Sequence, residues 1–168
     1  MKRLVIAIDG PSGAGKGTIS RTLSEALGYR HVDTGAMYRA VGWKALHEGI
    51  VLDDEAEVAA LAQRAAIVVE GGNVSIDGYD VSRATRTPEI DEAATAVARL
   101  PRVREVLVAG QRALGADGGV VMEGRDIGTV VFPQAVSTAI FAPLVFQLAQ
   151  RLHQSSAPVH ASPEGAVR

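Results

Sequence analysis

A glycine-rich turn between a short apolar run and an amphipathic segment constrains the fold of this chain more than any other feature. Residues 4–8, with the sequence LVIAI, form an apolar run of strand length, which is typical of a parallel strand covered on both faces. The turn that follows, residues 9–18, has the sequence DGPSGAGKGT. Its glycines let backbone N–H groups converge on one point, and the helix expected after it adds the positive end of its dipole. The sequence therefore predicts an anion-binding loop.

The lysine of this turn completes the pattern G-x-x-x-x-G-K, which is typical of loops that bind the β and γ phosphates of a nucleoside triphosphate. Gly17 stands where the general pattern has a hydroxyl, and the hydroxyl comes one residue later, at Thr18. Magnesium ligation by Thr18 is therefore left open. The predicted ATP-binding residues are Gly10, Pro11, Ser12, Gly13, Ala14, Gly15, Lys16, Gly17 and Thr18.

Alternating strand and helix patterns continue after the loop. The first helix is predicted to end at Gly28, and residues 29–32 and 36–46 predict a strand and a second helix, with Thr34 as a possible cap. This order is the signature of βαβ units, in which ligands bind at the carboxyl ends of the strands. The loop and residues 33–39 should therefore face one crevice. The apolar stripe expected on the first helix consists of Ile19, Leu23, Ala26 and Leu27.

The alternation of strand and helix patterns is interrupted at residues 67–87, where short strand patterns alternate with Gly and Asn turns. The predicted fold class is α/β: a three-layer, P-loop NTPase-like parallel sheet flanked by helices, with a small antiparallel β insert. Further strands are predicted near residues 120–122 and 137–142, with helices beginning near Thr87 and Pro101. Residues 1–142 would form the core, including the insert, and residues 143–168 a divergent helix and a poorly ordered tail.

Composition excludes several classes of site and partner. The chain has no cysteine, so a disulfide framework, a thiolate metal site and cysteine catalysis are excluded. Its net charge of −2 does not favour binding to a nucleic acid. The apolar run near residue 4 is too short for a signal peptide or a membrane span. We therefore expect a cytoplasmic monomer. The four histidines lack ligand spacing and are expected to be ordinary surface or core residues.

Phosphoryl transfer requires cations around the transferred group. Arg39 and Arg125 follow predicted strands, whereas Arg86 and Arg104 flank the insert and its helices. An isolated arginine is usually a solvated surface residue, but the strand-end position favours Arg39 and Arg125. Asp9 and Asp126 end apolar runs, so each is a candidate for holding Mg²⁺ or for capping a turn or helix; both alternatives stay open here.

Three segments together closely resemble bacterial cytidylate kinases. They are the loop, residues 33–39 with the sequence DTGAMYR, and residues 123–133 with the sequence EGRDIGTVVFP. The resemblance covers residues 2 to about 135. It implies ATP-dependent phosphorylation of CMP and dCMP to CDP and dCDP, with Mg²⁺ as cofactor.

The resemblance also implies roles for individual residues. In the family, the residues matching Thr34, Arg39 and Arg125 hold the acceptor nucleotide, and those matching Thr95, Arg104 and Asp126 read the cytosine edge. These roles fit the chemistry of cytosine, because its N4 amino group suits a carboxylate while its O2 and N3 suit a guanidinium and a hydroxyl. The expected sites are therefore catalytic groups at Lys16, Arg39, Arg125 and Asp126, substrate-binding groups at Thr34, Arg39, Thr95, Arg104, Arg125 and Asp126, and metal-binding groups at Thr18 and Asp9.

The chain departs from the family pattern after about residue 136. There the family continues with a basic helix and an arginine-rich lid over ATP, but the Lys and Arg residues after Asp126 are only Arg151 and Arg168. The resemblance thus implies a truncated or divergent form with at most four parallel strands and impaired turnover. Two alternatives are a nucleotide-binding remnant without turnover and a P-loop kinase for another small acceptor.

Overall fold

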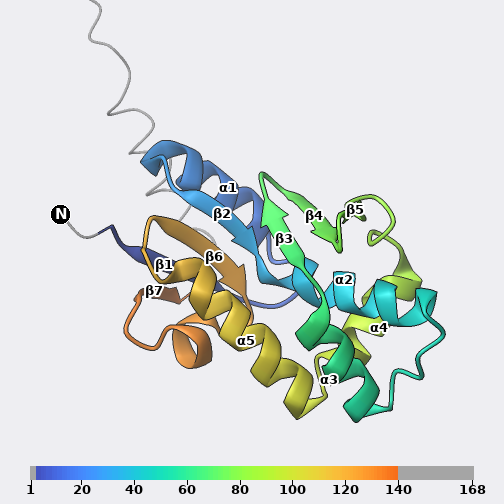
Figure 1. Ribbon diagram of the computed structural model, residues 1–168. Helices are drawn as coiled ribbons and strands as arrows, with labels where there is room; N and C mark the ends of the chain where they lie inside the picture. Colours follow the sequence, from blue (N-terminus) through green and yellow to red (C-terminus); the bar gives the residue numbers. More distant parts are fainter. Residues whose placement is uncertain (1–2, 140–168) are drawn as a thin grey trace, which may run out of the picture.

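A sheet of four parallel strands forms the centre of the molecule, in the order β2-β6-β1-β7 (Figure 1). The computed structural model describes residues 3–139. The four strands are β1 (Val5–Asp9), β2 (Arg30–Asp33), β6 (Val120–Gly124) and β7 (Val136–Ala139). The predicted limit of four parallel strands for the whole chain stays a prediction, because residues 140–168 are not described. The predicted helix and tail at residues 143–168, and residues 140–142 of the predicted fourth strand, lie outside the described residues.

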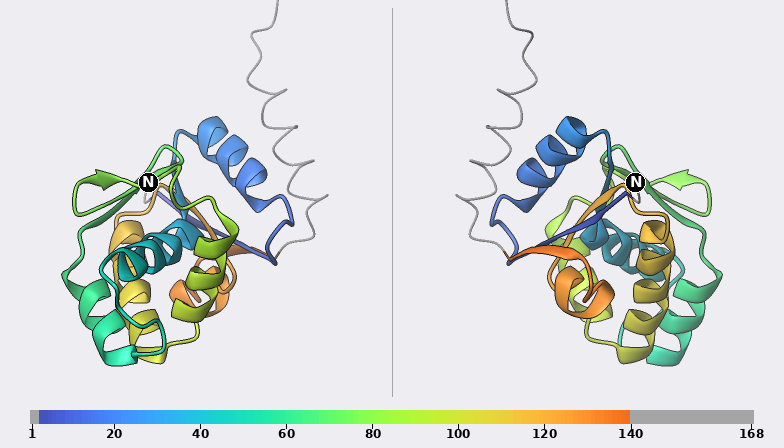
Figure 2. Two further views of the ribbon diagram at one scale, coloured as in Figure 1. Left: turned by 90° about the vertical axis from the view of Figure 1, so that its right-hand side faces the viewer. Right: turned by 90° about the vertical axis from the view of Figure 1, so that its left-hand side faces the viewer.

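Helices cover both faces of this sheet, which gives the three predicted layers (Figure 2). Helix α1 (Lys16–Leu27) packs Ile19 and Leu23 against Ile8 of β1 and Val121 of β6. The alternate side chains of the same strands face α5 (Pro101–Gly115) and the short π-helix η1 (Ile127–Val131). Each buried strand thus supplies apolar side chains to both faces, as its unbroken apolar run requires.

The stripe predicted on α1 is only half correct. Ala26 and Leu27 are exposed, and the buried face is completed by two small polar residues, Ser20 and Ser24. These two serines directly follow Ile19 and Leu23 in sequence, so the face in contact with the sheet is rotated toward them.

Helix α2 (Thr34–His47) begins directly at the end of β2. Its N-cap is Asp33, whose carboxylate accepts a hydrogen bond from the backbone N–H of Ala36 at 3.2 Å. The prediction of Thr34 as the cap was therefore wrong by one residue, and its hydroxyl serves another contact. The predicted second helix is confirmed, and its buried side includes Met37, Val41 and Ala45.

Two further helices complete the layer on the α2 side. Helix α3 (Glu55–Arg64) begins after Asp54, whose carboxylate accepts a hydrogen bond from the N–H of Glu57. Helix α4 (Pro88–Val97) begins as predicted, with the Thr87 hydroxyl accepting from the N–H of Ile90 and proline in the first turn.

The predicted antiparallel insert is confirmed as a three-stranded sheet of β3 (Ile67–Glu70), β4 (Asn73–Ile76) and β5 (Tyr79–Asp80). Val69, Val74 and Ile76 belong to the same buried cluster as the apolar faces of α2, α3 and α5. The insert therefore shares a core with the helical layer. Among residues 3–139, no helix combines the length and the apolar character needed to cross a membrane.

Candidate active site

The register of the central sheet brings the functional segments together at the carboxyl ends of three strands. Asp9 at the end of β1 pairs with Gly124 of β6, and Asp33 at the end of β2 pairs with Glu123. The N–H of Gly10 donates to the carbonyl oxygen of Gly124 at 3.2 Å. The glycine-rich loop, the start of α2 and the segment after β6 therefore form one continuous edge.

The glycine-rich loop has the geometry of an anion-binding site. Gly13 and Gly15 have φ values of 77° and 78°, a conformation that favours glycine, and Gly15 is the N-cap of α1 without a side-chain cap. The first backbone N–H groups of an α-helix have no acceptor within the helix, so those of Lys16 and its successors are available to a ligand. The Lys16 Nζ donates to the carbonyl oxygen of Pro11 at 2.7 Å, across the same turn.

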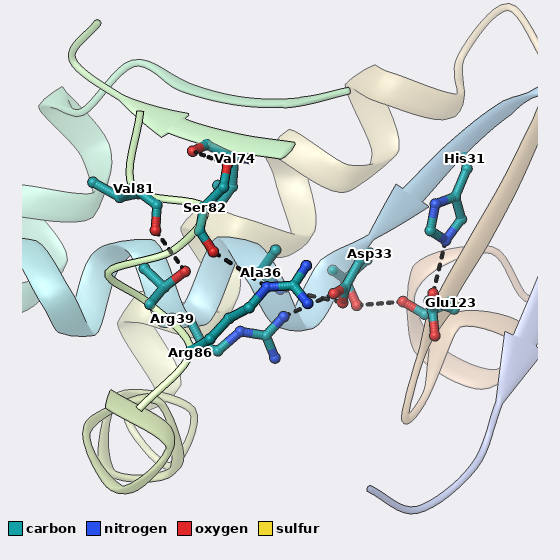
Figure 3. Close-up of polar contacts among 11 residues, drawn as sticks. His31, Asp33, Ala36, Arg39, Val74, Val81, Ser82, Arg86 and Glu123 are labelled. Carbon is teal, nitrogen blue, oxygen red and sulfur yellow. Dashed lines mark hydrogen bonds and ion pairs between the residues drawn. The ribbon is translucent and has the colours of Figure 1, made fainter. Parts of the chain in front are cut away.

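The start of α2 contributes a hydroxyl and a guanidinium. Thr34 is buried, and its Oγ1 donates to the carbonyl oxygen of Glu123 at 2.7 Å. Arg39 Nη2 lies 2.7 Å from the Asp33 carboxylate. Figure 3 shows Arg39 and Arg86 both extending toward Asp33, and Arg86 Nε donates to the carbonyl oxygen of Ser82 at 3.2 Å. Cationic side chains from α2 and from the end of the insert thus point to the same edge.

Position 124 requires glycine because the segment after β6 is tightly packed. A Cβ atom there would lie 2.6 Å from both Thr34 Oγ1 and Ile127 Cδ1. The absence of a side chain at Gly124 therefore lets α2 and η1 approach the end of β6.

Arg104 of α5 and Asp126 after β6 form an ion pair with partly exposed side chains. The Tyr38 phenol of α2 lies near this pair, and burial raises its pKa; the Arg104 guanidinium opposes that increase, and the Asp126 carboxylate adds to it. The phenol therefore stays neutral and protonated beside the ion pair at ordinary pH. Arg104 and Asp126, two of the residues predicted to read the cytosine edge, are thus in direct contact.

The other predicted residues are not joined in the same way. Thr95 is exposed, and its hydroxyl donates to the carbonyl oxygen of Asp91 within its own helix. Arg125 is exposed and forms no ion pair with residues 3–139. Thr18 is exposed in the first turn of α1. The roles expected for these residues stay predictions.

Asp9 caps the segment after β6. Its two carboxylate oxygens accept hydrogen bonds from the N–H groups of Ile127 and Gly128, at 2.6 Å and 2.8 Å. Of the two alternatives for Asp9, the capping contact is the one present in the structure, and magnesium binding stays a prediction.

Comparisons with known proteins agree with this geometry. A family profile described as Cytidylate kinase matches residues 6–157. The cytidylate kinase of Solibacter usitatus is 52% identical over 134 residues, covering 80% of this chain and 58% of that relative. The cytidylate kinase of Lysinibacillus sphaericus is 45% identical over 154 residues, covering 89% of this chain and 69% of the relative.

The chain belongs to the cytidylate kinase family. This is a family of phosphotransferases, and both the predicted recognition and the predicted fold class are confirmed. A bifunctional pantoate ligase/cytidylate kinase of Synechococcus sp. (strain JA-2-3B'a(2-13)) is 44% identical over 157 residues, covering 29% of its own length. The chain spans 58% of the length of the Solibacter relative and of the Caldanaerobacter subterraneus relative.

Sequence reasoning missed a contact between two side chains of β2 and β6 in this cytidylate kinase family member. Glu123 was named only as part of the segment EGRDIGTVVFP, and His31 was expected to be an ordinary surface or core residue. In the structure, His31 Nε2 lies 2.7 Å from Glu123 Oε1, and both side chains are buried (Figure 3). The available signal was a carboxylate inside the EGRD segment at the end of a buried strand next to β1.

A separate groove of about 570 Å³ lies between α1, β2 and β3. It is lined by His31 and by apolar side chains such as Ile67 and Val69, and by none of the predicted nucleotide-binding residues. The candidate active site is therefore assigned to the strand ends rather than to this groove.

Proposed function

We propose that this chain transfers the terminal phosphoryl group of ATP to CMP and dCMP, giving ADP and CDP or dCDP. The observation that carries the proposal is the edge of the sheet at which the anion-binding loop and the strand-end cations meet. The names of the relatives support cytidine nucleotides as acceptors.

The ion pair of Arg104 and Asp126 accounts for the choice of base. Asp126, as an ionised carboxylate, only accepts hydrogen bonds, so it matches the N4 amino group of cytosine and opposes the O4 oxygen of uracil. Arg104 only donates, so it matches N3 and O2 of cytosine. Thr95 is proposed to add its hydroxyl to this set. Asp126 thereby fixes the orientation of the acceptor.

The cations and the hydroxyl at the strand ends are proposed to bind the acceptor phosphate. Arg39 and Arg125 present planar guanidinium groups, which can bind the acceptor phosphate in a bidentate manner, and Thr34 lies at the same edge. Lys16 and the N–H groups of residues 10–18 are proposed to hold the β and γ phosphates of ATP.

The transfer itself requires little covalent work from the protein. An oxygen of the acceptor phosphate attacks the γ phosphorus, the bond from that phosphorus to the β–γ bridging oxygen breaks, and ADP leaves. Because the attacking oxygen is already ionised, no general base is needed. The chain acts by aligning the two phosphates and by stabilising charge on the transferred group with Lys16, Arg39 and Arg125.

The residues present fit a magnesium ion at the loop. A Cβ atom at Gly17 would lie 3.5 Å from Glu123 Oε1 and 3.8 Å from Oε2, so the carboxylate faces the first turn of α1 across the space that glycine leaves open. Thr18, Glu123 and Asp9 carry oxygen atoms of the kind that Mg²⁺ prefers, and they could hold the ion directly or through its bound water. Residues 3–139 contain no group of three or more His, Asp or Glu that could hold a metal unaided. A bound Mg²⁺ would neutralise charge on the β and γ phosphates, which would supply its remaining ligands.

The test is a mass-spectrometric assay of nucleoside diphosphates after incubation of the full chain with ATP and CMP, dCMP, UMP or AMP. We expect CDP and dCDP to form faster than UDP, and Lys16→Ala to abolish product formation. ATP binding without any diphosphate product would show a nucleotide-binding protein without turnover, and preferential formation of UDP or a second ADP would contradict the proposed acceptor.

The location and assembly follow from the same proposal. ATP and CMP are cytoplasmic metabolites, so the protein is proposed to act in the cytoplasm. It is proposed to act as a monomer, because the described edge joins both nucleotide-binding segments within one chain. Size-exclusion chromatography at several concentrations tests the second point.

A further inference from the structure

His31 and Glu123 form a buried polar contact between β2 and β6. His31 Nε2 and Glu123 Oε1 are 2.7 Å apart, and the two side chains are 8% and 7% exposed. The residues come from neighbouring strands, β2 and β6, at positions two residues apart in the register, where His31 pairs with Val121 and Asp33 with Glu123. Burying a carboxylate is costly unless it is hydrogen-bonded, so the contact compensates for the burial of Glu123.

The carboxylate of Glu123 reaches beyond the sheet toward the glycine-rich loop. A Cβ atom at Gly17 would lie 3.5 Å from Oε1 and 3.8 Å from Oε2 of Glu123, so the space beside Gly17 opens onto both oxygens. Oε1 is the oxygen that contacts His31, and Oε2 makes no hydrogen bond or ion pair with residues 3–139. One oxygen is therefore held by the imidazole while the other remains available at the loop.

The rest of residue 123 is held equally firmly. Its carbonyl oxygen accepts from Thr34 Oγ1 at 2.7 Å, and its backbone pairs with Ile8 on one side and Asp33 on the other. With the backbone of Glu123 fixed, the orientation of its side chain is what can still vary, and the contact with His31 fixes that orientation.

We propose that His31 is a positioning residue, which holds the Glu123 carboxylate at the glycine-rich loop so that its second oxygen can accept hydrogen bonds from the water ligands of a nucleotide-bound Mg²⁺. This inference rests on the proposed function, because it requires ATP at the loop. Since an ionised carboxylate only accepts hydrogen bonds, Nε2 of His31 carries the hydrogen in this contact. Position 31 acts through Glu123 and touches no reacting atom.

A purely structural role would give a different result from a positioning role. If the pair only fills the space between β2 and β6, its loss lowers the stability of the fold and leaves the response to Mg²⁺ unchanged. If it positions Glu123, its loss weakens the part of ATP affinity that depends on Mg²⁺ and leaves metal-free ATP binding intact, because Lys16 and the loop N–H groups are unchanged.

The experiment is isothermal titration calorimetry of the full chain with ATP, once with Mg²⁺ and once with EDTA. The variants are His31→Leu, which removes the donor, His31→Gln, which keeps an N–H donor, and Glu123→Gln, which keeps the shape and removes the charge. His47→Gln, at the end of α2, is the control. We expect the ratio of the two ATP affinities to fall about tenfold in His31→Leu and Glu123→Gln, the scale seen when groups that orient a metal's ligands are removed.

His31→Gln and His47→Gln are expected to keep that ratio within about twofold of the original chain, and the double variant His31→Leu with Glu123→Gln to lose no more than either single variant. An unchanged ratio in Glu123→Gln, or equal losses with and without Mg²⁺ in His31→Leu, would overturn the proposal. Should His31→Leu fail to fold, Glu123→Gln and His31→Gln still decide the matter. Failure of the proposed function is distinct, because it is measured as the absence of CDP and dCDP in the mass-spectrometric assay and not by the ratio of the two ATP affinities.

Discussion

Asp126 is the residue proposed to select cytosine over uracil. We predict that Asp126→Asn weakens CMP binding by about tenfold and narrows the preference for CMP over UMP, since an amide can donate to the O4 oxygen of uracil where a carboxylate cannot. ATP binding should be unaffected, because Asp126 lies at the Arg104 side of the edge. Thermal-shift titrations with CMP, UMP and ATP measure all three effects.

Asp117→Asn is the matched control for this prediction, because Asp117 is exposed after α5. It should behave as the original chain does with each nucleotide. A CMP-to-UMP preference that stays unchanged in Asp126→Asn would show that another residue reads the base.

The residues of the site were predictable to different degrees. Arg39 was proposed from its strand-end position, whereas Thr34 and Arg104 were proposed from the family resemblance, and the binding roles of all three stay predictions. The contact of His31 with Glu123 joins residues 92 positions apart and depends on the pairing of β2 with β6, which no local pattern specifies. The burial of Tyr38 beside Arg104 likewise depends on the packing of α2 against α5.

The packing of α2 on α4 depends on a glycine. A Cβ atom at Gly42 would lie 3.1 Å from both Ala93 Cβ and the backbone nitrogen of Ala94. We predict that Gly42→Leu lowers the free energy of unfolding by about 1–3 kcal/mol, because a larger side chain forces the two helices apart. Urea denaturation followed by circular dichroism measures the change.

Gly110→Ala provides a comparison within another helix. Among residues 3–139, its Cβ atom would meet only Met37 Cε, at 3.6 Å, which is ordinary contact distance, so this substitution should stabilise the protein by about 0.5–1 kcal/mol through helix propensity. Equal stabilities for Gly42→Leu and the original chain would mean that α2 and α4 are not packed as described.

The insert is attached to α2 by a pH-dependent contact. Lys44 Nζ lies 2.8 Å from Asp77 in the turn before β5, and the hydrogen bond from Lys44 lowers the pKa of Asp77 below its ordinary value. A carboxyl with a lowered pKa in the folded state contributes stability above its unfolded pKa, and that contribution is lost as the pH falls through the folded pKa. The effect should be small, because the Asp77 side chain is 31% exposed.

We therefore predict that the unfolding free energy of the original chain falls more steeply between about pH 5 and about pH 3 than that of Lys44→Met. Urea denaturation at several pH values in this range tests the prediction. Parallel pH profiles for the two proteins would show that the contact contributes nothing to stability.

At the scale of elements, local chemistry predicted most boundaries. Thr87 and Pro88 correctly marked the start of α4, since a capping hydroxyl followed by proline is specific to helix N-termini. The cap of α2 was misplaced because Asp33 and Thr34 are both capping residue types. The π-helix η1 was not predicted, because its N–H groups are capped by Asp9, which is more than a hundred positions away in sequence.

At the scale of the whole molecule, the two proposed binding regions lie along one edge of the sheet. The glycine-rich loop is the proposed donor side, and α2, α5 and the segment after β6 are the proposed acceptor side. The insert and α2 share one buried cluster, so a nucleotide bound beside Arg39 would affect both elements. We therefore predict that donor and acceptor bind at the same time, with their phosphates adjacent.

The most direct test is a crystal structure of the full chain with adenosine and cytidine joined by a chain of five phosphates. We predict that the adenosine side of the phosphate chain contacts Lys16 and the N–H groups of the loop, while cytosine contacts Arg104 and Asp126. A phosphate chain bound away from residues 10–18, or a cytosine ring that makes no contact with this ion pair, would contradict the account.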